Sequence, residues 1–141
     1  KLSVETTSGY VNISGGYWNE ADITTVSGAV DFTGTARELS LETTSGTVKA
    51  DAGFDKLDFS AVSGGLTLTM QRTAEVDAET TSGGVTIHLP PSAYGFMLDF
   101  DSVSGKPEIA FNANGGDGHW TYGDKASTLT VDTISGNLTL D

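Results

Sequence analysis

The sequence contains no cysteine, only three prolines, few basic residues and no long apolar run. Without cysteine, neither a disulfide scaffold nor a thiolate metal site can form. Seven Lys and Arg against 19 Asp and Glu give a net charge of −12, which excludes a protein that binds nucleic acid through a basic surface. No apolar run approaches the ~20 residues of a membrane-spanning helix.

What the sequence does contain is a repeated Ser-Gly dipeptide. In a similar sequence setting it occurs seven times along the chain, at intervals that are nearly constant up to the fifth copy and longer for the last two. We number the repeats as units 1 to 7 in chain order, centred on Ser8, Ser27, Ser45, Ser63, Ser82, Ser104 and Ser135. The repetition predicts one domain over residues 1–141, with an irregular excursion at 111–128 before the last unit.

Apolar residues alternate with polar ones on both sides of each dipeptide. Four positions before the serine, for example, the seven units carry Val4, Ile23, Leu41, Phe59, Ala78, Phe100 and Val131. A period of two on both sides of a small-residue turn predicts a strand, a Ser-Gly turn and a second strand in every unit. No stretch has a helical period, so the chain is predicted to be all-β.

A single unit is too short to bury enough apolar surface to be stable alone. Stacked in register at about 4.8 Å per layer, the units would bury a continuous core and pair their backbones with one another. A β-sandwich of coincidentally similar hairpins would not need the same turn seven times. The sequence therefore favours a single-stranded β-helix, or β-solenoid, over a sandwich.

The units alternate between two turn types. Odd units read Glu-Thr-Thr-Ser-Gly, with Asp132 to Gly136 as a looser copy, whereas even units carry Val-Ser-Gly or a close variant. One coil could hold one unit, with neighbours alternating, or two units, with like stacked on like. We favour two units per coil, because a stacked residue then meets the same environment in each coil. This arrangement would line up Glu5, Glu42, Glu79 and Asp132 on one edge.

The tiled pattern apolar-x-apolar-x-Thr-x-Ser-Gly-x-Val-x-apolar resembles the bacterial putative adhesin family, a β-strand-repeat domain of unknown function in Gram-positive cell-envelope proteins. The resemblance covers residues 2 to 140 and includes the closing segment Leu129 to Gly136. It implies a right-handed β-helix without established catalytic residues, located in the cell envelope or outside the cell, with the cytoplasm as the alternative. We expect the chain to be a domain excised from a protein with a leader or anchor.

The sequence predicts no catalytic residues and only two sets of candidate binding residues. Neither histidine, His88 or His119, lies in a recognisable triad motif. The recurring acids Glu5, Glu42, Glu79 and Asp132 are candidate Ca²⁺ ligands, since stacked carboxylates repel each other and a hard cation would relieve this. The other interpretation is that they are solvated acids that keep a repetitive protein soluble.

The second set consists of aromatic residues outside the repeat. Tyr17 and Trp18 lie in the first connection between units, and Trp120 and Tyr122 lie in the excursion. Exposed aromatics can stack on sugars or anchor an interface. They can equally cover the open ends of a solenoid, and we favour this packing role.

Three functional hypotheses follow. The first is a non-catalytic envelope module for display, adhesion or sensing, with a cationic peptide, a glycan or a protein as its partner. The second is a β-helix that binds or cleaves carbohydrate. The third is a structural spacer that associates end to end through open strand edges.

Overall fold

The computed structural model describes residues 1–71, 74–88, 95–109, 114–116, 118–123 and 127–140. These residues form strands and turns, and none of them is helical, which confirms the all-β class. The strands in chain order are β1 (Leu2–Ser8), β2 (Val11–Ser27), β3 (Val30–Thr43), β4 (Val48–Gly53), β5 (Lys56–Ala61), β6 (Leu66–Met70), β7 (Glu75–Thr80), β8 (Val85–His88), β9 (Gly95–Ser102), β10 (Pro107–Ile109), β11 (Asn114–Gly116), β12 (His119–Gly123), β13 (Ser127–Thr133) and β14 (Leu138–Leu140).

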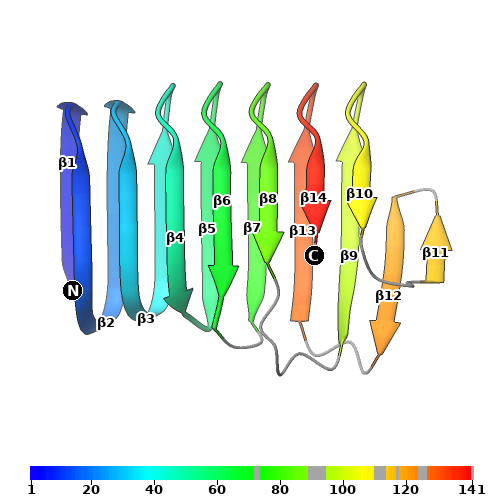
Figure 1. Ribbon diagram of the computed structural model, residues 1–141, viewed down its shortest axis with the longest axis horizontal. Coiled ribbons are helices and arrows are strands. Elements are labelled where there is room, and N and C mark those ends of the chain that lie inside the picture. The colour runs from blue at the N-terminus through cyan, green and yellow to red at the C-terminus, as the bar shows by residue number, and fades with distance from the viewer. Residues whose placement is uncertain (72–73, 89–94, 110–113, 117, 124–126, 141) are drawn as a thin grey trace.

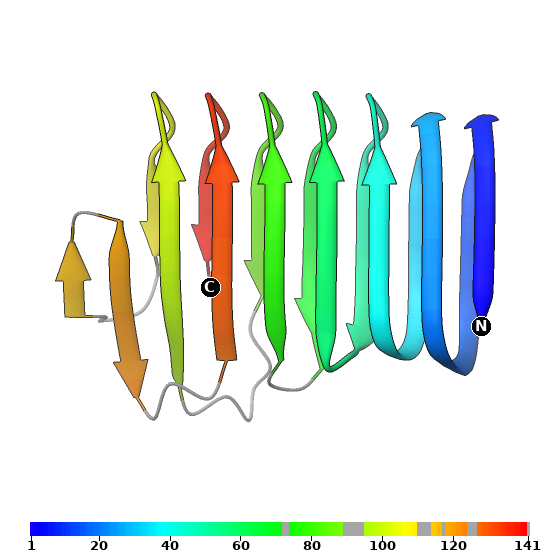
Figure 2. The same cartoon turned by 180° about the vertical axis from the view of Figure 1, so that it is seen from behind.

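The chain winds into a flattened β-solenoid with the Ser-Gly turns along one edge (Figure 1, Figure 2). Strands that precede the turns form the first sheet: β1, the later parts of β2 and β3, then β5, β7, β13 and β9. Strands that follow the turns form the second sheet: the earlier parts of β2 and β3, then β4, β6, β8, β14 and β10. All pairing between units is parallel.

Each coil of the solenoid holds one unit, so the predicted coil of two units is wrong. Leu2 of unit 1 pairs with Ala21 of unit 2, and Leu39 of unit 3 pairs with Leu57 of unit 4. The two turn types can alternate over units 1 to 5 because the residues that distinguish them, such as Glu42 and Val62, are exposed and need no matching neighbour. Most inward positions are apolar, and the inward position two before the turn serine is mainly threonine, so these positions stack equally well in either arrangement.

The last unit is not the last layer. β13 pairs with β7 on one side and with β9 on the other, and β14 likewise lies between β8 and β10. Unit 7 is thus inserted between units 5 and 6 (Figure 1). Unit 6 lies two layers from unit 5, which explains why the step from Ser82 to Ser104 is longer than the steps before it. The connection 89–94, which includes Pro90 and Pro91, lies outside the described residues.

Engineered disulfides should report this layer order directly, because the chain has no cysteine of its own. Thr130 pairs with Asp77 on one side and with Asp99 on the other. We expect Asp77→Cys with Thr130→Cys to cross-link on oxidation, since paired strands are about 4.8 Å apart. Asp77→Cys with Asp99→Cys, about 9.6 Å apart, should not. The reverse result in non-reducing electrophoresis would mean that the units stack in chain order.

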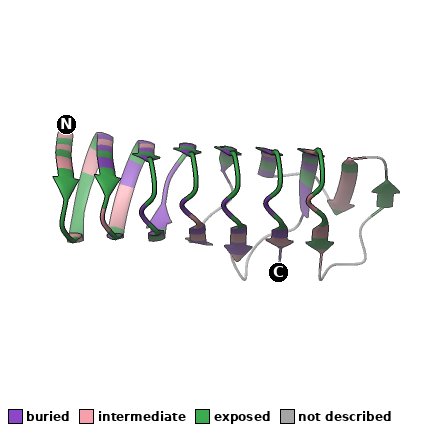
Figure 3. Cartoon of the chain, turned by 90° about the horizontal axis from the view of Figure 1, so that it is seen from above, coloured by how far each residue is buried: buried purple, intermediate pink, exposed green. Residues whose placement is uncertain are grey.

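The core fills the space between the two sheets, as the buried residues in Figure 3 show. Inward residues of the inner units, such as Leu57, Val76 and Leu129, are fully buried. In unit 1, which has a neighbour on one side only, the equivalent Leu2 and Val4 are half-buried. At the far end, part of the excursion 111–128 forms the hairpin β11–β12, and β12 pairs antiparallel with β9.

Candidate functional site

The charge of the molecule is concentrated on the outward side of the first sheet, which we call the acidic face. Twelve of the 19 acidic residues project from it: Glu5, Glu20, Asp22, Glu38, Glu42, Asp58, Glu75, Asp77, Glu79, Asp99, Asp101 and Asp132. The outward side of the second sheet carries mostly uncharged residues, including Thr67, Thr86 and Thr139. The face therefore creates a negative potential on one side of the solenoid.

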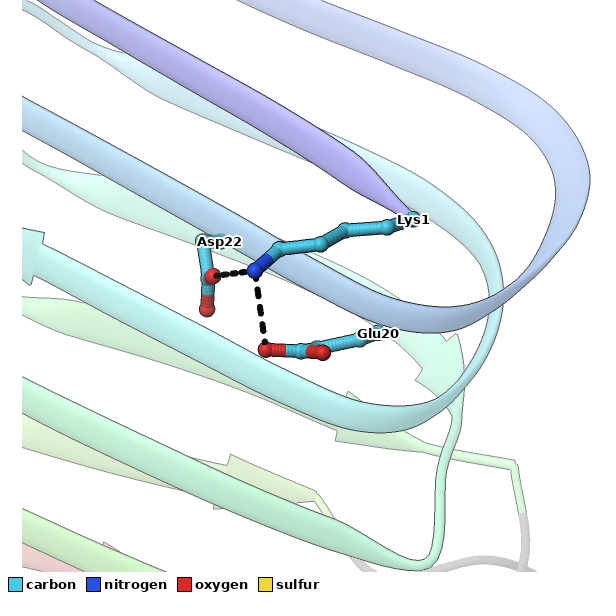
Figure 4. A network of polar contacts seen from close by, with 3 residues as sticks. All are labelled: Lys1, Glu20 and Asp22. Atoms are coloured by element: carbon cyan, nitrogen blue, oxygen red, sulfur yellow. Dashed lines mark ion pairs between the residues drawn. The ribbon is translucent and has the colours of Figure 1, made fainter.

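Two lysines in the described part of the chain lie near this face, and neither is at its far end, where units 7 and 6 lie. Lys1 Nζ is 3.4 Å from Glu20 Oε1 and 3.7 Å from Asp22 Oδ2, at the end where the chain enters the solenoid (Figure 4). Lys56 pairs in register with Glu38 in the middle of the sheet. In the described part of the chain, Glu79, Asp101 and Asp132 have no ion-pair partner.

The four predicted calcium ligands share one column of the acidic face but do not form a continuous line. Glu5, Glu42 and Glu79 are separated from one another by Thr24 and Ser60, and only Glu79 and Asp132 are direct neighbours. Carboxylates two layers apart, about 9.6 Å, are too distant to share a cation that binds oxygen at about 2.4 Å. Among the described residues, no group of three or more acids or histidines is placed to hold a metal ion. Calcium binding stays a prediction.

Acids are densest where units 5, 7 and 6 meet. Glu79, Asp132 and Asp101 occupy three successive layers of one column. Beside them in the next column lie Asp77 and Asp99, and His119 Nδ1 on β12 contacts the Asp99 carboxylate. Partial burial raises the pKa of the Asp132 carboxyl, and the nearby carboxylates, of which Asp101 contributes most, raise it further. The sequence places an acid at this position in three consecutive units, 5, 6 and 7, but the predicted coil of two units put Asp101 on the opposite edge from the other two.

Replacing Asp132 by asparagine should stabilise the protein at neutral pH. Because the pKa of Asp132 is raised in the folded state, the native protein binds its proton more tightly than the unfolded chain does. Stability from this group therefore grows as pH falls through that pKa and is lost at higher pH. In low salt, Asp132→Asn should melt at a higher temperature than the unchanged protein at pH 7, with the difference shrinking towards about pH 4. An equal gain from Asp51→Asn, on the second sheet, would show a general effect of net charge instead.

The serines of the Ser-Gly turns bond to the backbone of the neighbouring layer. Ser45 Oγ donates to the Val26 carbonyl oxygen at 3.3 Å, and Ser63 Oγ donates to that of Thr44 at 3.3 Å. The equivalent serines of units 2, 5, 6 and 7 do the same. These hydroxyls are structural, and none of them contacts a histidine in the part of the chain that the structure describes. The turn serines thus offer no activated nucleophile.

The Toastrack DUF4097 family model matches residues 1–95 of the chain. The chain belongs to this family. The matched part of the Toastrack domain contains units 1 to 5, whereas unit 7, unit 6 and the hairpin β11–β12 lie almost wholly beyond it. The match confirms the resemblance to a β-strand-repeat domain of unknown function.

The fold is also that of a solved protein. A crystal structure of a putative cell adhesion protein from Clostridium sporogenes superposes on the Toastrack domain with a TM-score of 0.57. The sequences are 12% identical, and the alignment covers 96% of this chain and 92% of the other. At this identity the likeness shows the fold alone. No protein with curated annotation matches the chain in sequence.

The four candidate aromatic residues lie at opposite ends of the Toastrack domain and do not form one binding surface. Trp18 packs against Phe32, with ring centroids 5.7 Å apart, and lies close to Gly16 and Gly34. At the far end, Trp120 packs against the core and Tyr122 stacks on Phe96 at 5.6 Å. Packing therefore accounts for Trp18, Trp120 and Tyr122.

Tyr17 is the exception among these aromatic residues, since 63% of its surface is exposed. Tyr10, outside the predicted set, is equally exposed, and its Oη donates to Asp31 Oδ2 at 3.1 Å. This hydrogen bond raises the pKa of the Tyr10 phenol.

The described residues of the Toastrack domain include no helix with the length and apolarity that a membrane span requires.

Proposed function

We propose that this Toastrack domain is a non-catalytic, adhesin-like module of the bacterial cell surface that binds a cationic partner across its acidic face. The observation that carries the proposal is the concentration of twelve of the 19 acidic residues on one side of a rigid two-sheet scaffold. Few of these acids face a basic side chain, so a partner would supply the missing positive charge.

Similarity to known proteins supports the adhesin-like part of this proposal. The family is a domain of unknown function, and the structural neighbour is described as a putative cell adhesion protein. The shallow surface grooves and the backbone-bonded turn serines also favour binding over catalysis. A flat face built from parallel strands suits an extended partner more than a small substrate that must be shielded from water.

The proposal is tested by titrating the domain with a synthetic peptide of ten Lys-Ser repeats at low ionic strength. The test variant combines Glu42→Gln, Asp58→Asn and Asp77→Asn on the acidic face. The control variant combines Asp31→Asn, Asp51→Asn and Glu108→Gln on the second sheet, with the same change in net charge. We expect the test variant to bind about tenfold more weakly and the control to change by less than about twofold.

Raising the salt concentration should weaken binding by the unchanged protein, because the exposed charges are then screened. Equal losses in the two variants would show attraction to net charge rather than to the acidic face. Binding that resists salt, or no binding at low salt, would contradict the proposal. Release of reducing sugars from cell-wall polysaccharide would contradict the proposal that the domain is non-catalytic.

A further inference from the structure

An exposed aliphatic ridge runs beside the acidic face, along the edge formed by the turns. Four of the seven large exposed hydrophobic residues in the described chain occupy the position immediately before the turn serine: Val26, Val62, Val103 and Ile134. Val103 is 83% exposed and Ile134 is 53% exposed. These two are neighbours, because units 7 and 6 are adjacent layers, whereas threonine separates the others. Apolar residues gathered on a surface in this way mark a contact site.

Between the ridge and the acids lies a groove that crosses units 5, 7 and 6. Its apolar wall consists of Thr81, Ile134 and Val103, and its other wall consists of Glu79, Asp132 and Asp101. Thr80 and Thr133 form the floor, and their hydroxyls already accept hydrogen bonds from the backbone N–H of Gly83 and Gly136. The three carboxylates are the charged groups of the groove, and no basic side chain of the described chain pairs with them.

Charge decides which class of ligand fits the groove. A second copy of the chain would present the same acids and be repelled. An uncharged apolar ligand would cover the ridge but leave three desolvated carboxylates without partners, which is costly. A divalent ion would contact the acids but not the ridge. A cation with an aliphatic body would pair with the carboxylates of one wall and pack against the aliphatic side chains of the other.

The spacing of the three carboxylates narrows the class of ligand further. The three carboxylates belong to successive layers about 4.8 Å apart. In an extended aliphatic amine, nitrogens separated by three carbons are about 5 Å apart, given ordinary bond lengths of about 1.5 Å. Such a chain lying across the strands would present one ammonium group to each layer.

We propose that this groove binds linear polyamines with three-carbon spacers, whose ammonium groups pair with Glu79, Asp132 and Asp101 and whose methylenes pack on Ile134 and Val103. The inference rests on the proposed binding of cations by the acidic face and names a ligand class for one part of it. Partial burial is the largest cause of the raised pKa of Asp132, and repulsion from the neighbouring carboxylates, Asp101 first, adds to it.

Isothermal titration calorimetry at low ionic strength tests the proposal with two triamines of equal charge. Bis(3-aminopropyl)amine has three-carbon spacers, and bis(hexamethylene)triamine has six-carbon spacers. We expect the first to bind about fivefold more tightly, because only its spacing matches the layers. Equal affinities, or tighter binding of the longer amine, would overturn the proposal.

Variants locate the site. Asp132→Asn and the pair Val103→Thr with Ile134→Thr should each weaken binding of bis(3-aminopropyl)amine about fivefold. Glu42→Gln, in the same column between Thr24 and Ser60, and Val26→Thr, at the other end of the ridge, should change it by less than about twofold. All of these side chains are exposed, and a cooperative melting transition at or above that of the unchanged protein, with the upward shift confined to Asp132→Asn, would confirm folding. Equal losses in the control variants would overturn the proposal.

The lysine–serine peptide separates this inference from the proposed function. If the peptide binds the acidic face and the triamines bind without preference, only the polyamine site is wrong. If neither binds, both proposals are wrong.

Discussion

Replacing Gly83 by alanine should destabilise the domain by about 3 kcal/mol or more. A Cβ built on this glycine would lie 1.8 Å from the carbonyl oxygen of Gly64 in the next layer. The obstacle is backbone rather than a flexible side chain, so the two layers would have to separate and weaken the hydrogen bonds around the turn. The measurement is the midpoint of urea unfolding, from which the free energy of unfolding follows.

Gly84, the next residue, provides a matched control. It is exposed, and a Cβ there would lie 3.6 Å from the Asn137 carbonyl oxygen, an ordinary van der Waals distance. Gly84→Ala should therefore change the free energy of unfolding by less than about 0.5 kcal/mol. Similar effects of the two substitutions would show that the close stacking of turn glycines is not what fixes the spacing of the layers.

Val131→Asp should unfold two layers of the solenoid rather than one. Val131 is fully buried at the centre of β13, and a carboxylate there would be desolvated at a cost of about 4 kcal/mol. Because β13 lies between β7 and β9, its loss removes the only parallel neighbour that β9 has among the described strands. Hydrogen exchange should show lost protection in β9 and β13 and retained protection in β2, β3 and β5.

Thr128→Asp is the control for the added charge, since Thr128 is exposed on the same strand. It should leave the exchange pattern unchanged and alter stability by less than about 1 kcal/mol. If β9 stayed protected in Val131→Asp, β9 would have to pair with another strand, and the inserted position of unit 7 would be wrong.

The sequence alone predicted the paired strands of the seven units, the turns and the inward columns, but not the hairpin β11–β12 or the continuation of β2 through the first connection. Val4, Leu41 and Val131 recur at one distance from the turn serine, and the structure places all three on the inner side of the first sheet. Periodicity succeeds here because a side chain on a strand alternates between core and solvent, and a slip by one residue would expose the whole apolar set.

Coil size was predicted wrongly for a physical reason. The difference between odd and even units lies in exposed residues such as Glu42 and Ser60. Because these side chains are hydrated, an unlike residue in the neighbouring layer costs little free energy. Thr43 and Thr80, which do face inward, occur in odd units, where each hydroxyl accepts a hydrogen bond from the glycine N–H three positions later, at 2.9 Å. In unit 4 the same position is Ala61, so this bond is not required in every layer.

The repeat pattern did not predict the order of the layers, because units 6 and 7 follow the same inward apolar pattern, although Phe100 and Pro107 of unit 6 differ in size from Val131 and Leu138 of unit 7. Leu98 and Leu129 occupy the same position and are equally buried. The one signal was the step from Ser82 to Ser104, which is longer than the step from Ser63 to Ser82. The contiguity of Glu79, Asp132 and Asp101 followed only once each layer was known to hold one unit.

The inserted position of unit 7 has a mechanical consequence. A load applied at Leu140 pulls on a strand held by β8 on one side and β10 on the other, so two rows of parallel hydrogen bonds must break together. A load applied at Leu2 pulls on β1, which has a single neighbour among the described strands and can be peeled away one bond at a time. Strands β1 and β14 therefore differ in their resistance to force, and β14 is the harder of the two to detach.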